Sequence, residues 1–211
     1  MQLLQALNWR YAVKRFSNHA VSQHQLQTLL EATRLSPSSY GLQPYRLIVV
    51  EDTALREQLV QHSYGQDKVL NCANLIVFAA FKDIDHQFVT DHMARLTSSR
   101  KLNAATQQHL EQQYRRALVD QVDAQQRQQW IRDQTYLALG NFLTSAALLN
   151  IDACPMTGID SQRYDQLLQL PTANLTTIAI ATVGIRHPED GYASQPKVRL
   201  SMDELVNWVR P

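Results

Sequence analysis

The sequence contains little of several residue types on which common binding sites depend. Its six glycines are scattered, so they form neither a dinucleotide-binding fingerprint nor a P-loop. Only two cysteines, Cys72 and Cys154, are present, which excludes a disulfide framework, and the seven histidines show no zinc-ligand spacing. We expect both thiols to be free and buried, and we expect no metal site. A phosphate-bearing ligand would have to be held mainly by cationic side chains.

A large excess of charge and long apolar runs are also absent. The net charge is only +1, whereas a domain that binds double-stranded DNA normally has a basic excess. No apolar run approaches the roughly 20 residues that span a bilayer, and the N-terminus has no signal-peptide pattern. The hydrophobic fraction of 45% is that of a globular protein. We therefore expect a single soluble, cytoplasmic domain over residues 1–211, with neither nucleic acid nor membrane as a partner.

Basic residues at the two ends of the chain are the most informative feature that is present. Arg10 and Lys14 would share one face of a helix, because they are four residues apart. Lys197 and Arg199 would share one face of an extended segment. If the fold brings the ends together, these cations can converge on one anion. Spacing alone favours the alternative of two separate solvated patches.

Hydrophobic periodicity predicts a mixed α and β protein in which helices outnumber strands. Ser22 and Gln25 form a capping box, and Asp52 and Asp160 are N-cap candidates for two further helices. The expected helices cover residues 2–13, the segments after Ser22 and Asp52, much of 85–130, 131–149 and 160–168. The expected strands cover residues 45–50, 75–81 and 176–183.

Two of these helical regions have an unusual composition. Residues 85–130 are polar, and we expect a helical excursion that projects or covers the active site. Within it, Asp91 and His92 are expected to form a solvated helix face. Residues 131–149 are apolar nearly all round, so this helix must be enclosed, either in the core or in a dimer interface.

Five segments have a local character that these elements do not explain. They are W-R-Y-A-V-K-R-F at 9–16, S-P-S-S-Y-G-L-Q-P-Y at 36–45, G-Q-D-K-V at 65–69, P-M-T-G-I-D at 155–160 and P-K-V-R-L at 196–200. In order and spacing they resemble the motifs of the nitroreductase family, and the loop at 36–45 is the most specific match. The resemblance extends over the whole chain. The departures from the family pattern bear on substrate preference and leave the phosphate ligands in place; they include Ala12, Gly41, Tyr45 and Thr157.

The resemblance implies an α+β, three-layer α/β/α fold, with a mixed, mainly antiparallel sheet flanked by helices. It also implies an intertwined homodimer with FMN at the subunit interface. The implied activity is an NAD(P)H-dependent FMN oxidoreductase that reduces nitroaromatics, quinones or similar small-molecule acceptors by a ping-pong hydride mechanism. Members with specialised flavin chemistry (dehalogenation, azoline oxidation, flavin consumption) and a non-catalytic flavin- or nucleotide-binding module remain the alternatives.

The resemblance also assigns residues to the site. Arg10, Lys197 and Arg199 would hold the FMN phosphate. Tyr11 and Ala12 would contact it through backbone and neighbouring atoms, and Lys14 would support the flavin electrostatically at its N1/O2 side. Because the chemistry would be carried by the flavin, we name no catalytic acid.

The other assigned residues come from the remaining motifs. Further FMN contacts are implied for Gln66 at the pyrimidine edge, for Thr157 and Gly158 near N5, and for Pro37, Ser38 and Ser39 from the other subunit. Tyr40 and Lys68 would line the NAD(P)H and substrate channel. Without the resemblance, Ser38 and Ser39 could belong to a simple turn, Gly158 to another, and Lys68 to an exposed helix face.

Overall fold

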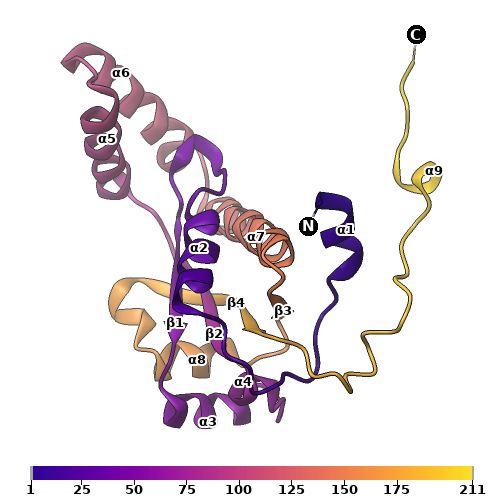
Figure 1. The fold of residues 1–211 in the computed structure, drawn as a ribbon. Coiled ribbons are helices and arrows are strands. Elements are labelled where there is room, and N and C mark those ends of the chain that lie inside the picture. Colours follow the sequence, from indigo (N-terminus) through magenta and orange to yellow (C-terminus); the bar gives the residue numbers. More distant parts are fainter. Residues whose placement is uncertain (1, 211) are drawn as a thin grey trace.

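A four-stranded antiparallel sheet forms the centre of the computed structural model, which describes residues 2–210 (Figure 1). Its strands lie in the order β1 (Tyr45–Val50), β2 (Asn74–Phe81), β4 (Leu175–Gly184) and β3 (Asp152–Met156). The three predicted strands are confirmed, and β3 was not predicted. Asp and Pro are unfavourable in strands, and Pro155 is tolerated here because β3 lies at the edge of the sheet.

One face of the sheet packs against two long helices. These are α2 (Gln23–Arg34), which begins with the predicted capping box, and α7 (Ala124–Leu148). Alternate β2 residues, Ile76 and Phe78, point into this layer, and the ring of Phe78 meets that of Phe142 edge to face at 5.3 Å. Aromatic and aliphatic burial of this kind fixes the helices to the sheet.

The opposite face is covered by shorter helices. These are α3 (Thr53–Gln61), α4 (Lys68–Asn71) and α8 (Ser161–Leu167). The other set of β2 residues, Leu75 and Val77, points into this layer. Because successive strand residues face opposite sides, β2 is apolar on both faces, and the predicted three-layer α/β/α arrangement is confirmed.

Helices α5 (His86–Arg100) and α6 (Ala104–Arg115) project beyond the sheet (Figure 1). A π-helical turn over Arg116–Asp120 connects α6 to the segment before α7. The excursion is helical as predicted. Its role as a cover stays a prediction. Short 3₁₀ turns at Ser39–Gly41 and Leu170–Ala173 complete the connections.

The first helix is shorter than predicted. Helix α1 spans Leu3–Trp9, and Arg10 already has an extended backbone. Arg10 and Lys14 therefore do not share a helical face, and the expected helix over residues 2–13 is wrong. The cause is tertiary: residues 12–16 lie alongside the sheet edge, where Ala12 forms a parallel bridge to Ala153.

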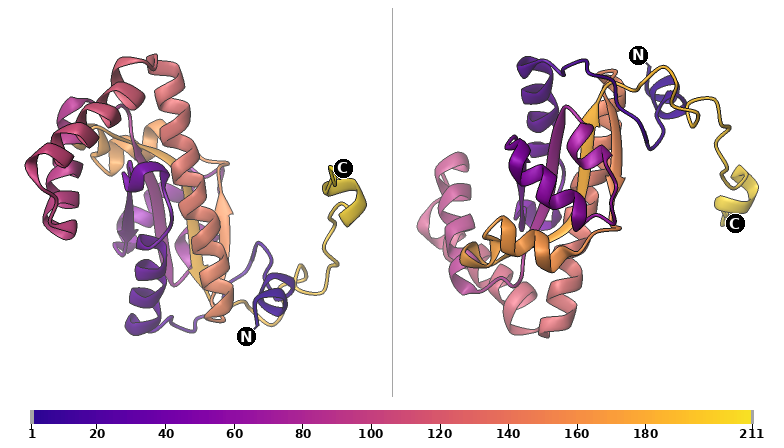
Figure 2. Two further views of the ribbon diagram at one scale, coloured as in Figure 1. Left: turned by 90° about the horizontal axis from the view of Figure 1, so that it is seen from above. Right: turned by 90° about the horizontal axis from the view of Figure 1, so that it is seen from below.

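The C-terminal segment follows the N-terminal segment and then leaves the body of the protomer. It contains α9 (Met202–Leu205), and Figure 2 shows it extending past α1 and away from the sheet. Large apolar side chains are exposed on α1, on α7 and on this segment, among them Leu4, Leu137, Leu205 and Trp208. Within the protomer, α7 is therefore only partly enclosed. No helix between residues 2 and 210 is both long enough and apolar enough to cross a membrane.

Candidate functional site

The two ends of the chain are joined by one carboxylate. Asp190 accepts hydrogen bonds from the backbone N–H groups of Lys14 (2.8 Å), Arg15 (3.1 Å) and Tyr192 (3.1 Å). Burial of Asp190 opposes its ionisation, but these donors, Arg15 first, together hold its pKa below the ordinary value. The ionised carboxylate thus fixes the segment after residue 188 against the segment around Lys14.

A second contact fixes the segment on either side of Arg10. The guanidinium of Arg186 donates to the buried carboxylate of Asp152 at 2.6 and 2.9 Å. The same guanidinium lies 4.0 Å from the ring centre of Trp9 and 4.5 Å from that of Tyr11. Since Trp9 and Tyr11 flank Arg10, their contacts with Arg186 fix the position of the Arg10 backbone.

Three predicted phosphate ligands meet at this point. Lys197 Nζ donates to the backbone carbonyl of Arg10. Burial lowers the pKa of Arg10, and the nearby Arg199 lowers it further; for Lys197 the causes are burial, then Arg10 and Arg199. The two ends of the chain therefore converge, and the alternative of two separate patches is wrong. We call Arg10, Lys197 and Arg199 the cation cluster.

The cation cluster carries unneutralised charge. Over residues 2–210 no carboxylate lies within salt-bridge distance of any of its three members. The partial burial of Arg10 and the mutual repulsion of the three cations both raise the free energy of the charged cluster. A bound anion would relieve both, and guanidinium groups match the geometry of a phosphate. The donor set therefore fits the phosphate of FMN.

A second group of predicted residues lies around α4 and the loop after β3. Lys68 Nζ donates to Gln66 Oε1 at 2.8 Å, and Gln66 Nε2 donates to the carbonyl of Gly158 at 3.3 Å. Thr157 is the neighbour of Gly158 in the same loop. Lys68 is buried, so its alternative assignment to an exposed helix face is wrong. The structure thus brings the G-Q-D-K and M-T-G motifs together.

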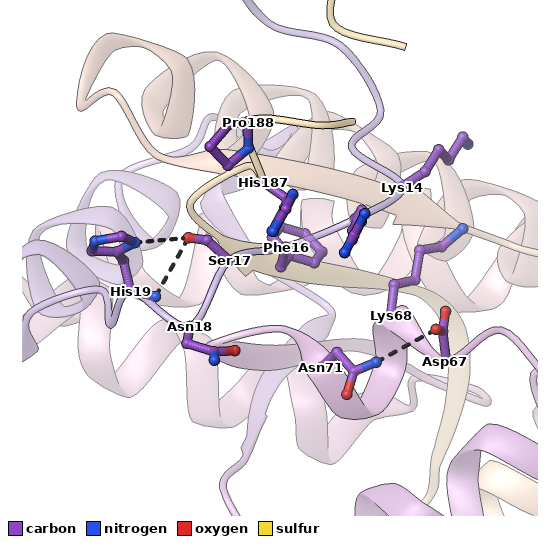
Figure 3. Close-up of a pocket in the computed structure, with 11 residues that line it drawn as sticks. Lys14, Phe16, Ser17, Asn18, His19, Asp67, Lys68, Asn71, His187 and Pro188 are labelled. Carbon is purple, nitrogen blue, oxygen red and sulfur yellow. Dashed lines mark hydrogen bonds between the residues drawn. The ribbon is translucent and has the colours of Figure 1, made fainter. Parts of the chain in front are cut away.

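Lys14 and Lys68 line a hollow of about 840 Å³ (Figure 3). The two side chains extend in the same direction in this view. Burial raises the pKa of the Cys154 thiol, and Lys68, Lys14 and Arg10 oppose this rise. Cys154 on β3 therefore lies in the electrostatic field of Lys68, Lys14 and Arg10. Arg10 lies four residues before Lys14 in the same segment. Both cysteines are buried and free, as predicted.

The serine loop lies elsewhere in the protomer. Pro37, Ser38 and Ser39 follow the C-terminal end of α2, a helix of 12 residues that is about 18 Å long. The loop lies near α6 and α7, whereas the segments that follow α1 and precede α9, which carry the cation cluster, lie on the other side of the sheet from this loop (Figure 1). The serine loop is held by Gln134, whose Oε1 accepts a hydrogen bond from the backbone N–H of Ser39 at 2.8 Å. Within one protomer the loop and the cation cluster do not form one site.

Tyr40 continues this loop in a left-handed conformation, with φ of 57°. Its ring lies 4.7 Å from that of Tyr114 on α6. The neighbouring His92 on α5 is buried, so the expectation of a solvated helix face is wrong for this residue, while Asp91 is exposed. The buried residues Val89 and Met93 mark the inner face of α5, and this spacing was the signal that His92 belongs to it.

Three structural residues of the site have no local sequence signal. Asp190 joins partners up to 176 positions away. The pair of Asp152 and Arg186 spans 34 positions. Side chains that act through such distant partners are not recognisable from their own surroundings in the sequence.

Comparisons with known proteins show the family of the chain. The profile described as "Nitroreductase family" matches residues 7–185. A protein of Staphylococcus saprophyticus named "Putative NAD(P)H nitroreductase" is 35% identical over 216 residues, covering 98% of this chain and 96% of the relative. The chain belongs to the nitroreductase family. The family prediction made from the five motifs is therefore confirmed.

Solved structures of other family members have the same fold. A nitroreductase-like protein of Streptococcus mutans superposes with a TM-score of 0.85 at 20% identity, covering 98% of both chains. A protein of Exiguobacterium sibiricum that was solved in complex with FMN has a TM-score of 0.82 at 16% identity, covering 99% of this chain and 98% of that one. At these identities the likeness shows the nitroreductase fold alone, and this is the predicted fold.

Proposed function

We propose that this chain is an NAD(P)H-dependent FMN oxidoreductase of the cytoplasm that acts as an intertwined homodimer. It would reduce nitroaromatics, quinones or similar acceptors by a ping-pong mechanism, with NAD(P)H leaving before the acceptor enters. The observation that carries the proposal is the cation cluster, because its uncompensated charge includes Arg10, four residues before Lys14, which lines a hollow. When bound, FMN supplies the hydride acceptor and donor for both half-reactions.

The phosphate end of the site belongs to one subunit. Arg10, Lys197 and Arg199 would hold the phosphate, with Tyr11 and Ala12 beside it. The relatives named as NAD(P)H nitroreductases and the FMN-bound structure of the same fold support this assignment. Asp190 and Arg186 contribute indirectly, because they hold the two chain ends in place.

The ring end of the site would use both subunits. Lys14, Gln66, Thr157 and Gly158 would contact the ring from the subunit that holds the phosphate. The ammonium of Lys14 favours negative charge at the pyrimidine side and so promotes reduction by hydride. Lys68 would line the substrate channel there, since it lies next to Gln66.

The partner subunit would supply the serine loop. Pro37, Ser38 and Ser39 would lie along the ring, and Tyr40 would line the substrate channel. The separation of this loop from the cation cluster within one protomer supports a shared site. The exposed apolar side chains of α1, α7 and the C-terminal segment support the homodimer, since a partner would cover them.

Anaerobic titration of the purified protein with NADH and with NADPH tests this proposal. We expect a yellow protein whose visible absorption bleaches with one of the nucleotides and returns on addition of a quinone. A colourless protein that takes up no FMN would contradict it and favour a non-catalytic binding module. A flavin that stays bound but turns over slowly with NAD(P)H and quinone would favour specialised flavin chemistry.

A further inference from the structure

A second hollow lies between the Tyr40 loop, α5 and α6. Its volume is about 510 Å³, and its lining includes Tyr40, His92, Arg95, Arg100 and Tyr114. The rings of Tyr40 and Tyr114 are 4.7 Å apart, and that of His92 is 6.1 Å from Tyr114. A hollow of this size with aromatic walls fits one small aromatic molecule.

The charge at this hollow is positive and unpaired. In the part of the chain that the structure describes, neither Arg95 nor Arg100 has a carboxylate within salt-bridge distance. Burial, Arg95 and Arg100 lower the pKa of His92, while the nearby backbone of Tyr40 opposes this change. Arg95 also adds to the burial that lowers the pKa of Arg46. Both guanidinium groups therefore direct their field at this region.

The acids nearest in sequence are already engaged. Glu111 accepts from Arg115 at 2.6 Å, and Asp91 accepts from Gln87 at 2.8 Å. Glu111 is thus paired with a cation, while Asp91 keeps its charge; neither acid is among the residues that line the hollow. An anionic group that entered the hollow would meet cations and no competing carboxylate.

His92 supplies an independent observation. Its side chain belongs to a residue that is only 7% exposed, and its Nε2 atom has no hydrogen-bond partner among residues 2–210. A buried polar atom without a partner costs free energy. His92 is among the residues that line the hollow, and a small rotation of its ring on ligand binding would let Nε2 form the missing hydrogen bond.

We propose that this hollow selects aromatic electron acceptors that carry a carboxylate. Tyr40 and Tyr114 would contact the ring, while Arg95, Arg100 and His92 would recognise the acid group. The inference rests on the proposed function, since Tyr40 directly follows the loop that would lie along the flavin ring. The 2′-phosphate of NADPH is a less suitable occupant, because it lies at the far end of a dinucleotide from the ring that reacts.

The test compares two acceptors that differ mainly in charge. Reduced, FMN-loaded enzyme is mixed with 4-nitrobenzoate or with 4-nitrobenzyl alcohol, and reoxidation is followed by stopped flow. We expect the wild type to prefer the benzoate. Removing both charges with R95Q/R100Q should lower its second-order rate constant about tenfold or more, the scale of a lost hydrogen bond to a charged group. The rate with the alcohol should change less than about twofold.

Two further variants sharpen the comparison. His92→Phe keeps a buried ring and removes Nε2, so it should lower the benzoate rate alone. Arg163→Gln, an exposed charge on α8 outside the hollow, is the control and should change neither rate. Calorimetric titration of the oxidised wild type and R95Q/R100Q proteins with 4-nitrobenzoate gives a readout independent of turnover, and binding should weaken in the variant.

The remaining outcomes overturn the inference in distinguishable ways. Equal wild-type rates for the two acceptors would show that the hollow does not discriminate between a charged and a neutral acceptor. A loss confined to reduction by NADPH, with NADH and benzoate unaffected, would assign the arginines to the nucleotide phosphate. Absence of flavin absorption before mixing would refute the proposed function itself, and the inference with it.

Discussion

The cation cluster and the hollow beside Tyr40 are built in opposite ways. The cluster depends on contacts between the two ends of the chain, such as the bond from Lys14 to Asp190 across 176 positions. The hollow is formed by one loop and two neighbouring helices that project from the sheet. The cation cluster is anchored to the sheet edge, which suits a ligand that is the same in every reaction, as a cofactor is. The residues of the hollow can be substituted without disturbing the sheet, which suits a region that selects the acceptor.

The largest expected effect comes from removing the ion pair between Asp152 and Arg186, which fixes the segment around Arg10. Asp152→Ala should lower the free energy of unfolding by about 3–5 kcal/mol, because Arg186 loses its buried partner. Urea unfolding of the apoprotein measures this. Glu31→Gln, which removes an exposed ion pair with Arg34, is the control and should leave the midpoint unchanged. A small loss for Asp152→Ala would show that Trp9 and Tyr11 hold Arg186 without the carboxylate.

The next effect removes one member of the cluster. Arg199→Ala should weaken FMN binding by about 1.5–3 kcal/mol, the scale of a hydrogen bond to a charged group. Its stability without FMN should change little, since Arg199 is exposed. Titration of the apoprotein with FMN checks the prediction, and Arg163→Gln is a matched control. Unchanged affinity would remove Arg199 from the phosphate site.

A smaller effect concerns the second region. Gln134→Ala leaves the N–H of Ser39 without its partner and should lower the free energy of unfolding by about 1–3 kcal/mol. Gln128→Ala, at an exposed position of the same helix, should have no effect on the denaturation midpoint. If the two variants are equally stable, water replaces Gln134 and the loop is not anchored by α7.

The smallest expected effect is the loss of stability when Asp190 becomes protonated at acid pH. Its pKa is lower in the folded state than in the unfolded chain, so its ionised form stabilises the fold. This contribution is complete above about pH 4, the pKa range of an unfolded aspartate, and is lost as the pH falls further. Urea unfolding of wild type and Asp190→Asn between pH 6 and pH 3 should give curves that converge at acid pH. A gap that stays constant would exclude titration of Asp190 as its source.

Local sequence patterns were sufficient for much of the fold. Ser22 with Gln25, Asp52 and Asp160 mark helix starts because a cap acts on its own backbone. The strands from residues 74 and 175 are recognisable because both of their faces are buried. By contrast, the segment after Trp9 looks helical, and only its pairing with the sheet edge extends it.

The candidate site also contains some residues that the sequence could predict and others that it could not. Residues that recur in motifs, such as Lys68 and Gly158, were assigned from the family resemblance, and the structure places them side by side with Gln66. His92 was misplaced because its burial depends on how α5 lies against the Tyr40 loop. The arginines of the hollow carry no motif, so only the arrangement of α5 and α6 makes them recognisable.

The central claim is that each flavin is held by the chain ends of one subunit and the serine loop of the other. Co-expression of Arg199→Ala with Ser39→Trp tests it most directly, when activity is measured at a limiting FMN concentration at which neither variant alone is active. Random pairing puts both lesions on one site of each mixed dimer and leaves the other intact, so purified protein should recover about a quarter of wild-type activity. Recovery no greater than the sum of the separate variants would contradict the shared site.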